Sequence, residues 1–332
     1  MPSRGRLVAM AKRSFEDKLE ELDALSSLSR EEASSALQTA LKNTNNYLVA
    51  KAAEMVRKLG MTELTPDLNA AFERFFIDAA TRDPQCWAKN ALSRVLAEFE
   101  FQDSGVFLRG VRHIQMEPVW GGRSDTAGTL RSTCAQALVG CRDLREPELL
   151  ALLIELFRDK DKAVRAEAAR AVAQVGSDAA TLLLRLRATL GNDEPEVLAG
   201  CFSGVLAIEG SGAIAWVEQF LKQEDEIAAE AALALGQTRS SEALHALQKI
   251  FAEHTDVWFG EVLLSAIALT RRDEAFEFLL EMVREESRFA AEAIPAMWNA
   301  VPSPEVRERL ETAVRDTGND RLLRVFQGVR GT

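Results

Sequence analysis

Tyrosine, histidine and proline are scarce in this 332-residue chain, which contains one tyrosine, three histidines and nine prolines. No H-E-x-x-H sequence occurs, so a zinc protease of that type would lack its ligands. Neither G-x-x-x-x-G-K-[ST] nor G-x-G-x-x-G is present, so both common phosphate-binding motifs are missing. The sequence therefore predicts no enzyme active site, no bound metal and no cofactor.

Cysteine is also rare, and the four cysteines form no C-x-x-C pair. Cys86, Cys134 and Cys201 fall within apolar helical patterns, where a small buried hydrophobic side chain is expected. Free thiols favour a reducing compartment. No signal peptide and no apolar run of membrane-spanning length is apparent in the sequence. We therefore expect a cytoplasmic protein that does not associate with membranes.

Basic residues are too few to balance the acidic ones in the second part of the chain. The formal net charge is -11, and residues 1–145 carry 20 lysines and arginines against 19 acidic residues. The remaining residues carry 20 against 32, so nearly all the excess negative charge lies there. Such a surface repels nucleic acid and anionic membranes. The charge pattern argues against nucleic-acid binding and favours a protein partner with a basic surface.

A helical apolar stripe is the clearest feature that is present. Between Ala163 and Gly176, apolar or small residues recur at helical spacing. The residues on the stripe are Val164, Ala168, Ala169, Val172 and Val175. The two central alanines would allow a neighbouring helix to approach closely, as stacked helices require.

The stripe returns along the chain at intervals of 30 to 43 residues. Its first positions are Leu48, Trp87, Leu130, Val164, Val197, Ile227, Phe259 and Phe289. Partner helices and short polar turns lie between them, a period typical of an α-solenoid. We predict an all-α right-handed superhelix of about eight helix pairs. Residues 1–13 would be a disordered basic tail, 14–317 a single repeat domain, and 318–332 a closing helix and tail.

One repeat carries a recognisable consensus, in which Asp161 precedes Val164 and Arg165 and an alanine-rich stretch follows, Ala168, Ala169, Ala171 and Val172. These residues resemble the HEAT and HEAT-like (phycobilisome-lyase-type) repeat family, and the resemblance extends over about Arg30 to Thr317. It implies an α-solenoid. It names no activity, because members act as scaffolds, adaptors and occasionally enzymes.

The longest interval, 43 residues, lies between Trp87 and Leu130 and contains an insertion at residues 115–128. This stretch is too glycine-rich for a helix and resembles an insertion in bacterial HEAT-repeat proteins. Insertions in repeat proteins gather on one face, which is often the binding face. We predict that Trp120 and nearby polar residues contact a partner. The candidate partner-binding residues are Trp120, Arg123, Asp125, Arg112, His113 and Arg131.

Two other interpretations of the insertion stay open at this stage. Trp120 could be a structural plug that fills a gap between repeats, with Arg123 paired to Asp125 and His113 on the surface. Alternatively, the insertion could cover the pocket of a HEAT-like enzyme or of a chromophore or ligand chaperone similar to the bilin lyases. A deep cavity under Trp120 would favour the pocket, whereas an exposed ridge would favour a non-catalytic protein-interaction scaffold that also uses its concave face.

Overall fold

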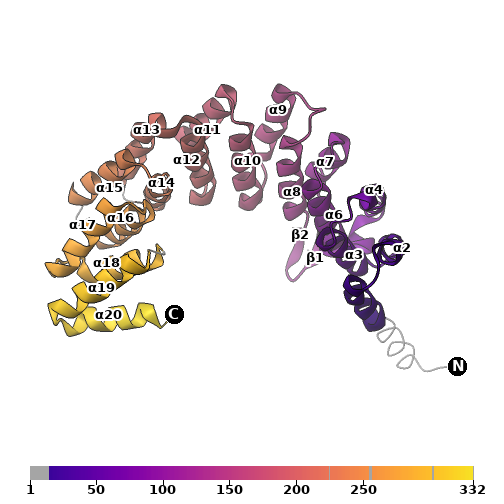
Figure 1. Ribbon diagram of the computed structural model, residues 1–332. Coiled ribbons are helices and arrows are strands. Elements are labelled where there is room, and N and C mark those ends of the chain that lie inside the picture. Colours follow the sequence, from indigo (N-terminus) through magenta and orange to yellow (C-terminus); the bar gives the residue numbers. More distant parts are fainter. Residues whose placement is uncertain (1–14, 224, 254–255, 301–302, 332) are drawn as a thin grey trace. The chain divides into compact units, whose positions relative to one another are not determined.

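The computed structural model describes residues 15–223, 225–253, 256–300 and 303–331. The described chain is an all-α solenoid that contains a single two-stranded sheet (Figure 1). The predicted tail at residues 1–13 lies outside the described residues. The chain divides into two compact units, residues 1–171 and 172–332. The prediction of one continuous domain and the predicted hand of the superhelix stay predictions.

The first unit begins with a helix over residues 15–24. Its further elements are α2 (Arg30–Leu41), α3 (Asn46–Lys58), α4 (Thr65–Arg74), α5 (Ala79–Arg82), α6 (Trp87–Glu98), α7 (Ser104–Val111), β1 (Met116–Val119), β2 (Gly122–Asp125), α8 (Gly128–Val139), α9 (Glu146–Leu156) and most of α10 (Lys162–Val175). Helices α3, α6 and α8 pack side by side in sequence order, and α7 packs against α8. These contacts form the core of the unit.

The second unit repeats the same arrangement of paired helices. Its elements are α11 (Asp178–Leu190), α12 (Pro195–Glu209), α13 (Ile214–Glu218), α14 (Glu226–Gln237), α15 (Ser241–Glu253), α16 (Val257–Leu269), α17 (Asp273–Arg284), α18 (Ala290–Asn299), α19 (Pro304–Thr317) and α20 (Asp320–Arg330). Helices α12, α14, α16 and α18 pack in succession, and α20 closes the series against α18. Each of the eight predicted stripes thus coincides with an observed helix, which confirms the repeat pattern.

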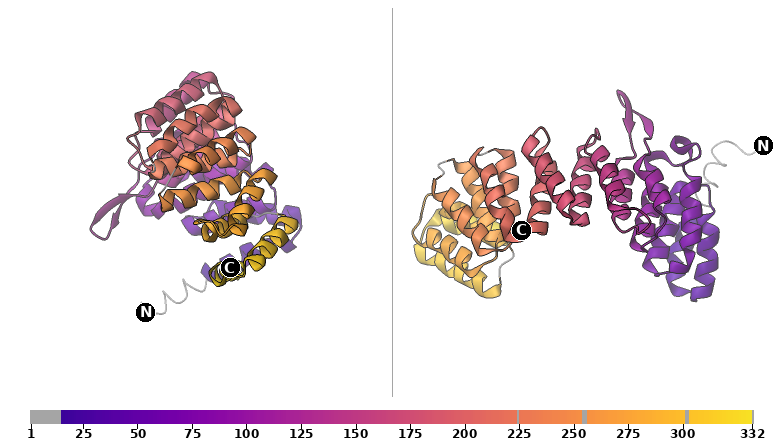
Figure 2. Two further views of the ribbon diagram at one scale, coloured as in Figure 1. Left: turned by 90° about the vertical axis from the view of Figure 1, so that its left-hand side faces the viewer. Right: turned by 90° about the horizontal axis from the view of Figure 1, so that it is seen from above.

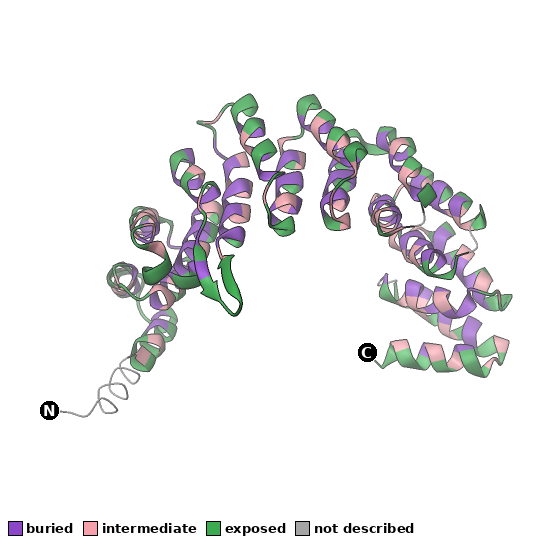
Figure 3. Cartoon of the chain, turned by 180° about the vertical axis from the view of Figure 1, so that it is seen from behind, coloured by how far each residue is buried: buried purple, intermediate pink, exposed green. Residues whose placement is uncertain are grey.

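Local sequence explains where several helices begin. Ser29 accepts a hydrogen bond from the backbone of Glu32, and the Glu32 carboxylate accepts one in return from the Ser29 backbone, which together form a capping box. The helix that follows buries Ala33, Leu37 and Leu41. Figure 3 shows the result in each unit, with buried residues on the helix sides that face other helices and exposed residues outward. The period of the stripe therefore places the core.

Glycine permits the closest helix contacts. A Cβ atom at Gly236 in α14 would lie 2.3 Å from the backbone oxygen of Ala266 in α16. In the same unit, a Cβ at Gly204 in α12 would lie 2.8 Å from the Cβ of Ala173. Real Cβ atoms do not approach other atoms this closely, so both helix pairs depend on the missing side chain.

One helical stretch, Pro195–Gln223, is long and apolar enough to cross a membrane by length and composition alone. Half of its most apolar window is buried within the protein. The stretch is also not one straight helix, because Gly210 adopts a φ of 61° and separates α12 from a 3₁₀ turn and α13. Burial and this break both favour a helix pair of the core.

Candidate functional site

The predicted insertion forms a β-hairpin, which we call the arm and define as residues 116–125. Its strands β1 and β2 are antiparallel, with Met116 opposite Asp125 and Val119 opposite Gly122. The arm projects from the side of the first unit, away from the helices that precede and follow it (Figure 2). The prediction that this stretch is not helical is confirmed, although the hairpin itself was not predicted.

A two-residue turn, Trp120-Gly121, joins the strands of the arm. Gly121 has a φ of 89°, a backbone conformation that glycine adopts without the steric cost of a side chain. The turn holds Trp120 at the tip, where its relative exposure is 102%. The interpretation of Trp120 as a buried plug is therefore wrong, because no part of the first unit covers the indole ring.

A buried carboxylate fixes β1 to the body of the first unit. Glu117 is 8% exposed, and its Oε1 atom accepts hydrogen bonds from three donors. These are the Gln85 backbone N–H at 2.7 Å, the Gln115 side-chain amide at 2.5 Å and the Thr126 hydroxyl at 2.7 Å. Burial raises the pKa of Glu117, but these hydrogen bonds outweigh it and the net pKa is lowered. Glu117 is thus ionised at neutral pH, and its Oε1 atom anchors β1.

Arg131, on α8, fixes the other end of the arm. It is 4% exposed and forms a two-pronged contact with Asp159, with distances of 2.7 Å from Nε and 3.1 Å from Nη2. Its Nη1 atom lies 2.7 Å from Asp125 Oδ2 and donates to the His113 carbonyl at 3.0 Å. Asp125 Oδ1 also accepts from the backbone N–H groups of Gln115 and Ala127. Arg131 therefore links the end of β2 to the turn before α10.

A second buried ion pair, which was not predicted from the sequence, also supports the base of the arm. Asp83 and Lys89 are both fully buried, and their side chains are 2.9 Å apart. Asp83 also accepts from the backbone N–H groups of Ala88 and Lys89, while its own backbone oxygen accepts from Gln115. A lysine on the apolar side of α6 was the sequence signal, since such a residue needs an anionic partner when buried.

Backbone strain accompanies this ion pair. Asp78, Gln85 and Cys86 all have positive φ values of 51°, 59° and 55°. None of them is glycine, and each such residue costs free energy unless the surroundings hold it in place. Asp83 and Glu117 supply that constraint on either side of Gln85, because both hydrogen-bond the segment. The strained segment therefore supports the base of the arm.

The six predicted residues lie in three places. His113, Asp125 and Arg131 meet at the base of the arm, as described. Trp120 and Arg123 lie on the arm itself, and Arg123 donates to the Met116 carbonyl at 2.7 Å. The predicted Arg123–Asp125 pair is therefore wrong, because Asp125 pairs with Arg131 instead. Arg112 is exposed at the end of α7.

His113 is partly buried, so the interpretation of it as a surface residue is also wrong. Its ring contacts Phe76 edge-on at 4.9 Å between centroids, and its Nε2 atom lies 3.0 Å from Gln115 Oε1. Burial lowers the pKa of His113, so the neutral imidazole is favoured at neutral pH. His113 and Arg123 do not converge on a common space under Trp120.

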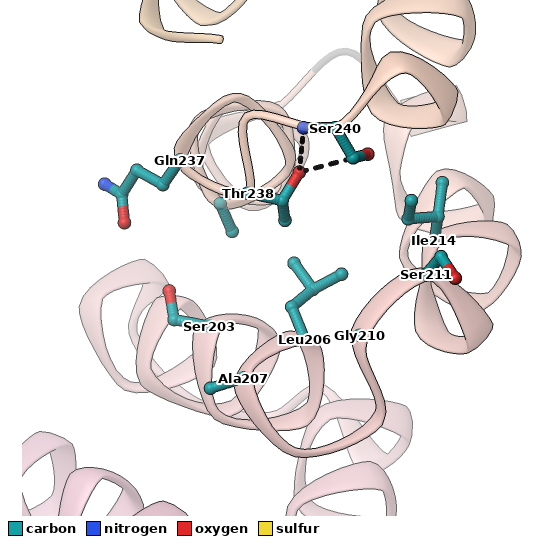
Figure 4. A pocket seen from close by; sticks show the side chains of 10 residues that line it. Ser203, Leu206, Ala207, Gly210, Ser211, Ile214, Gln237, Thr238 and Ser240 are labelled. Atoms are coloured by element: carbon teal, nitrogen blue, oxygen red, sulfur yellow. Dashed lines mark hydrogen bonds between the residues drawn. The ribbon is translucent and has the colours of Figure 1, made fainter.

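A cavity of roughly 390 Å³ lies elsewhere, in the second unit between α12 and α14 (Figure 4). It is lined by small, apolar and hydroxyl side chains and by the amide of Gln237, and no charged residue lines it. The Thr238 hydroxyl bonds the Leu235 carbonyl at 2.7 Å, and Ser240 Oγ accepts from the Ala243 backbone at 3.0 Å. These polar atoms are therefore already engaged in capping α14 and α15. Within the described part of the chain, no group of three His, Cys, Asp or Glu residues could hold a metal ion.

Comparison with known proteins supports the repeat assignment. A family model described as HEAT repeats matches residues 122–200. No curated protein sequence matches the chain. A crystal structure of an engineered protein is similar over 95% of this chain and 92% of its own, at 16% identity and a TM-score of 0.34, a score that supports no conclusion about shared fold. Residues 122–200 are thus similar to HEAT repeats, and paired helices continue on either side of them.

Proposed function

We propose that the protein is a non-catalytic scaffold that binds a protein partner through the arm. HEAT repeats generally serve as protein-interaction scaffolds, and the repeat pattern supports this broad class. The arm adds a surface that the repeats alone do not provide. The cytoplasmic location expected from the sequence belongs to the same proposal, and the four buried free thiols agree with it.

The observation that carries the proposal is the contrast between the tip of the arm and its base. Glu117, Asp125 and Arg131 tie the base to the body through partly buried, charge-assisted hydrogen bonds. The tip carries a tryptophan that is fully exposed. Exposed tryptophan on a positioned support is typical of an interaction hot spot, where one side chain contributes about 2 kcal/mol or more to binding. The anchored base would limit the entropy lost on docking.

The geometry gives less support to an enzyme or a ligand chaperone at the insertion. Those functions need a cavity in which Trp120, His113 and Arg123 face a common ligand. Trp120 instead projects into solvent, His113 contacts Phe76, and Arg123 lies along its own hairpin. We therefore keep the scaffold as the proposed function.

The helix surface of the second half is a further part of the proposal. Its acidic excess favours a partner with a basic surface. Burial raises the pKa of Glu230 in α14, and the nearby charge of Glu196 in α12 raises it further. A cationic partner surface would relieve this repulsion.

Quantitative affinity capture from a lysate of the source organism tests the role of the arm. The intact chain is compared with Trp120→Ala and with Trp258→Ala, a matched change at a second exposed tryptophan (46% exposed) on α16. We expect Trp120→Ala to lose a partner that the other two retain, with an unchanged melting temperature because Trp120 packs against nothing. Equal recovery by all three proteins would contradict a docking role for the tip.

A further inference from the structure

The two edges of the arm differ in what they offer to another strand. The Thr126 backbone N–H donates to the Gln115 carbonyl at 3.0 Å, so these two residues form a hydrogen-bonded pair. Antiparallel ladders alternate between hydrogen-bonded and non-hydrogen-bonded pairs. Pro118 and Arg123 are opposite each other, three register steps further out, and therefore form a non-hydrogen-bonded pair. The backbone groups of such residues point outward, away from the hairpin.

The outward edge of β1 is poorly suited to pair with another strand. Pro118 has no backbone N–H to donate there. The Met116 carbonyl also faces outward, because Met116 and Asp125 form the other non-hydrogen-bonded pair, and it is already bonded by the Arg123 guanidinium. Proline and occupied carbonyls are common ways in which proteins block strand edges. One edge of the arm is therefore closed.

The outward edge of β2 is open. Arg123 and Asp125 each present a backbone N–H and a carbonyl on this side, and Arg123 is exposed. Gly122 lies opposite Val119 and has no side chain to cover it. Val119 is 48% exposed, so its apolar side chain is accessible at the tip. An added strand would bring backbone hydrogen bonds and side-chain contact with Val119 and Trp120 at once.

The charges of the arm determine which kind of strand could be added beside β2. Its two carboxylates are both engaged, Glu117 by three hydrogen-bond donors and Asp125 by Arg131 and two backbone N–H groups. The exposed cation, Arg123, lies on the strand with the open edge; one of its guanidinium nitrogens bonds the Met116 carbonyl, so an added acidic residue would compete for the group. An acidic residue directly across from Arg123 would form a favourable cross-strand pair, whereas a basic one would be repelled.

We propose that the β2 edge binds an extended acidic peptide segment of a partner protein by adding it as a third strand. This inference rests on the proposed function and specifies the chemistry of the partner segment. The segment would place an acidic side chain beside Arg123 and β-branched or apolar side chains on the opposite face, towards Val119. Its backbone would pair with Arg123 and Asp125.

A peptide-display selection on the full-length protein tests the proposal. A library of random twelve-residue peptides is selected in parallel on the intact chain, on Arg123→Glu and on Arg123→Pro. Arg123→Pro removes the outward N–H but no ladder hydrogen bond, whereas Arg123→Glu keeps the N–H and reverses the charge. Both changes also remove the guanidinium bond to the Met116 carbonyl. We expect acidic peptides rich in β-branched residues from the intact chain, with Kd weakened about tenfold or more by either change. Arg123→Glu should instead select basic peptides.

Hydrogen exchange supplies the second readout and the control on folding. Bound peptide should slow amide exchange at Arg123 and Asp125, and exchange at Glu117 and Ser124 should show that the hairpin persists in both variants. Peptides that bind all three proteins equally, helical or basic peptides from the intact chain, or no enriched peptide would each overturn the edge-pairing proposal. Peptides that depend on Trp120 but not on Arg123 would overturn it too, while leaving the proposed docking role of the arm intact.

Discussion

Single buried charges decide where the arm sits. Asp83 and Lys89 have no exposed side-chain surface, and they meet at 2.9 Å beneath a segment with three strained residues. Removing one member of a buried pair leaves the other charge desolvated and uncompensated. Breaking this pair should therefore lower the free energy of unfolding by far more than the loss of one exposed contact would.

We predict that Lys89→Ala destabilises the protein by about 3–5 kcal/mol, because it leaves Asp83 buried without its cation. Urea denaturation followed by circular dichroism measures the loss. Arg94→Ala is the matched control, since Arg94 pairs with Glu54 at 3.1 Å but its side chain is 54% exposed, and it should cost less than about 1 kcal/mol. Similar losses from the two changes would show that the buried pair is not structurally important.

His113 gives the base of the arm a pH dependence. Its pKa is lowered in the folded protein by burial, so the folded state binds fewer protons than the unfolded state near the unfolded value of about 6.5. Stability from the neutral ring is therefore present above that pH and is lost as the pH falls through the lowered pKa. We expect the stability difference between the protein and His113→Gln to shrink from about pH 8 to about pH 5. A difference that is constant with pH would contradict this role.

At the scale of elements, the sequence predicted the helices better than the hairpin. A 3.6-residue stripe is repeated many times along the chain, and Ser29 with Glu32 marks a helix start by itself. The arm has only four residues in each strand, and Pro118 interrupts the alternation that would mark one of them. Its anchors are contacts between residues distant in sequence, such as Glu117 with Gln85 and Arg131 with Asp159. No local pattern reveals those partners.

Helix packing in the second unit provides a prediction about glycine. Gly236→Ala should destabilise the protein by about 1–3 kcal/mol, because its new Cβ would lie 2.3 Å from the Ala266 backbone oxygen. Gly212→Ala is the control, since no atom lies within 4 Å of the position of its Cβ and its backbone needs no positive φ. Gly212→Ala should be neutral or slightly stabilising. Equal melting temperatures for the two variants would show that α14 and α16 do not require the close approach.

At the scale of the whole molecule, each helix pair is stabilised mainly by its neighbours, as in other repeat proteins. An arrangement of this kind tolerates an insertion between α7 and α8, because the hairpin interrupts no core contact between α6 and α8. We propose that the repeats support the arm and that the arm provides a separate surface for recognition. We propose above all that this surface, with Trp120 at its tip, contacts a protein partner.

Site-specific photocrosslinking tests that claim most directly. A benzophenone amino acid is placed at position 120 of the full-length chain in the source organism, and at position 258 as the exposed tryptophan control. We predict a discrete crosslinked protein from position 120 that position 258 does not give, and competition by excess unlabelled chain but not by Trp120→Ala. No adduct at position 120, or the same adducts from both positions, would contradict a docking role for the arm.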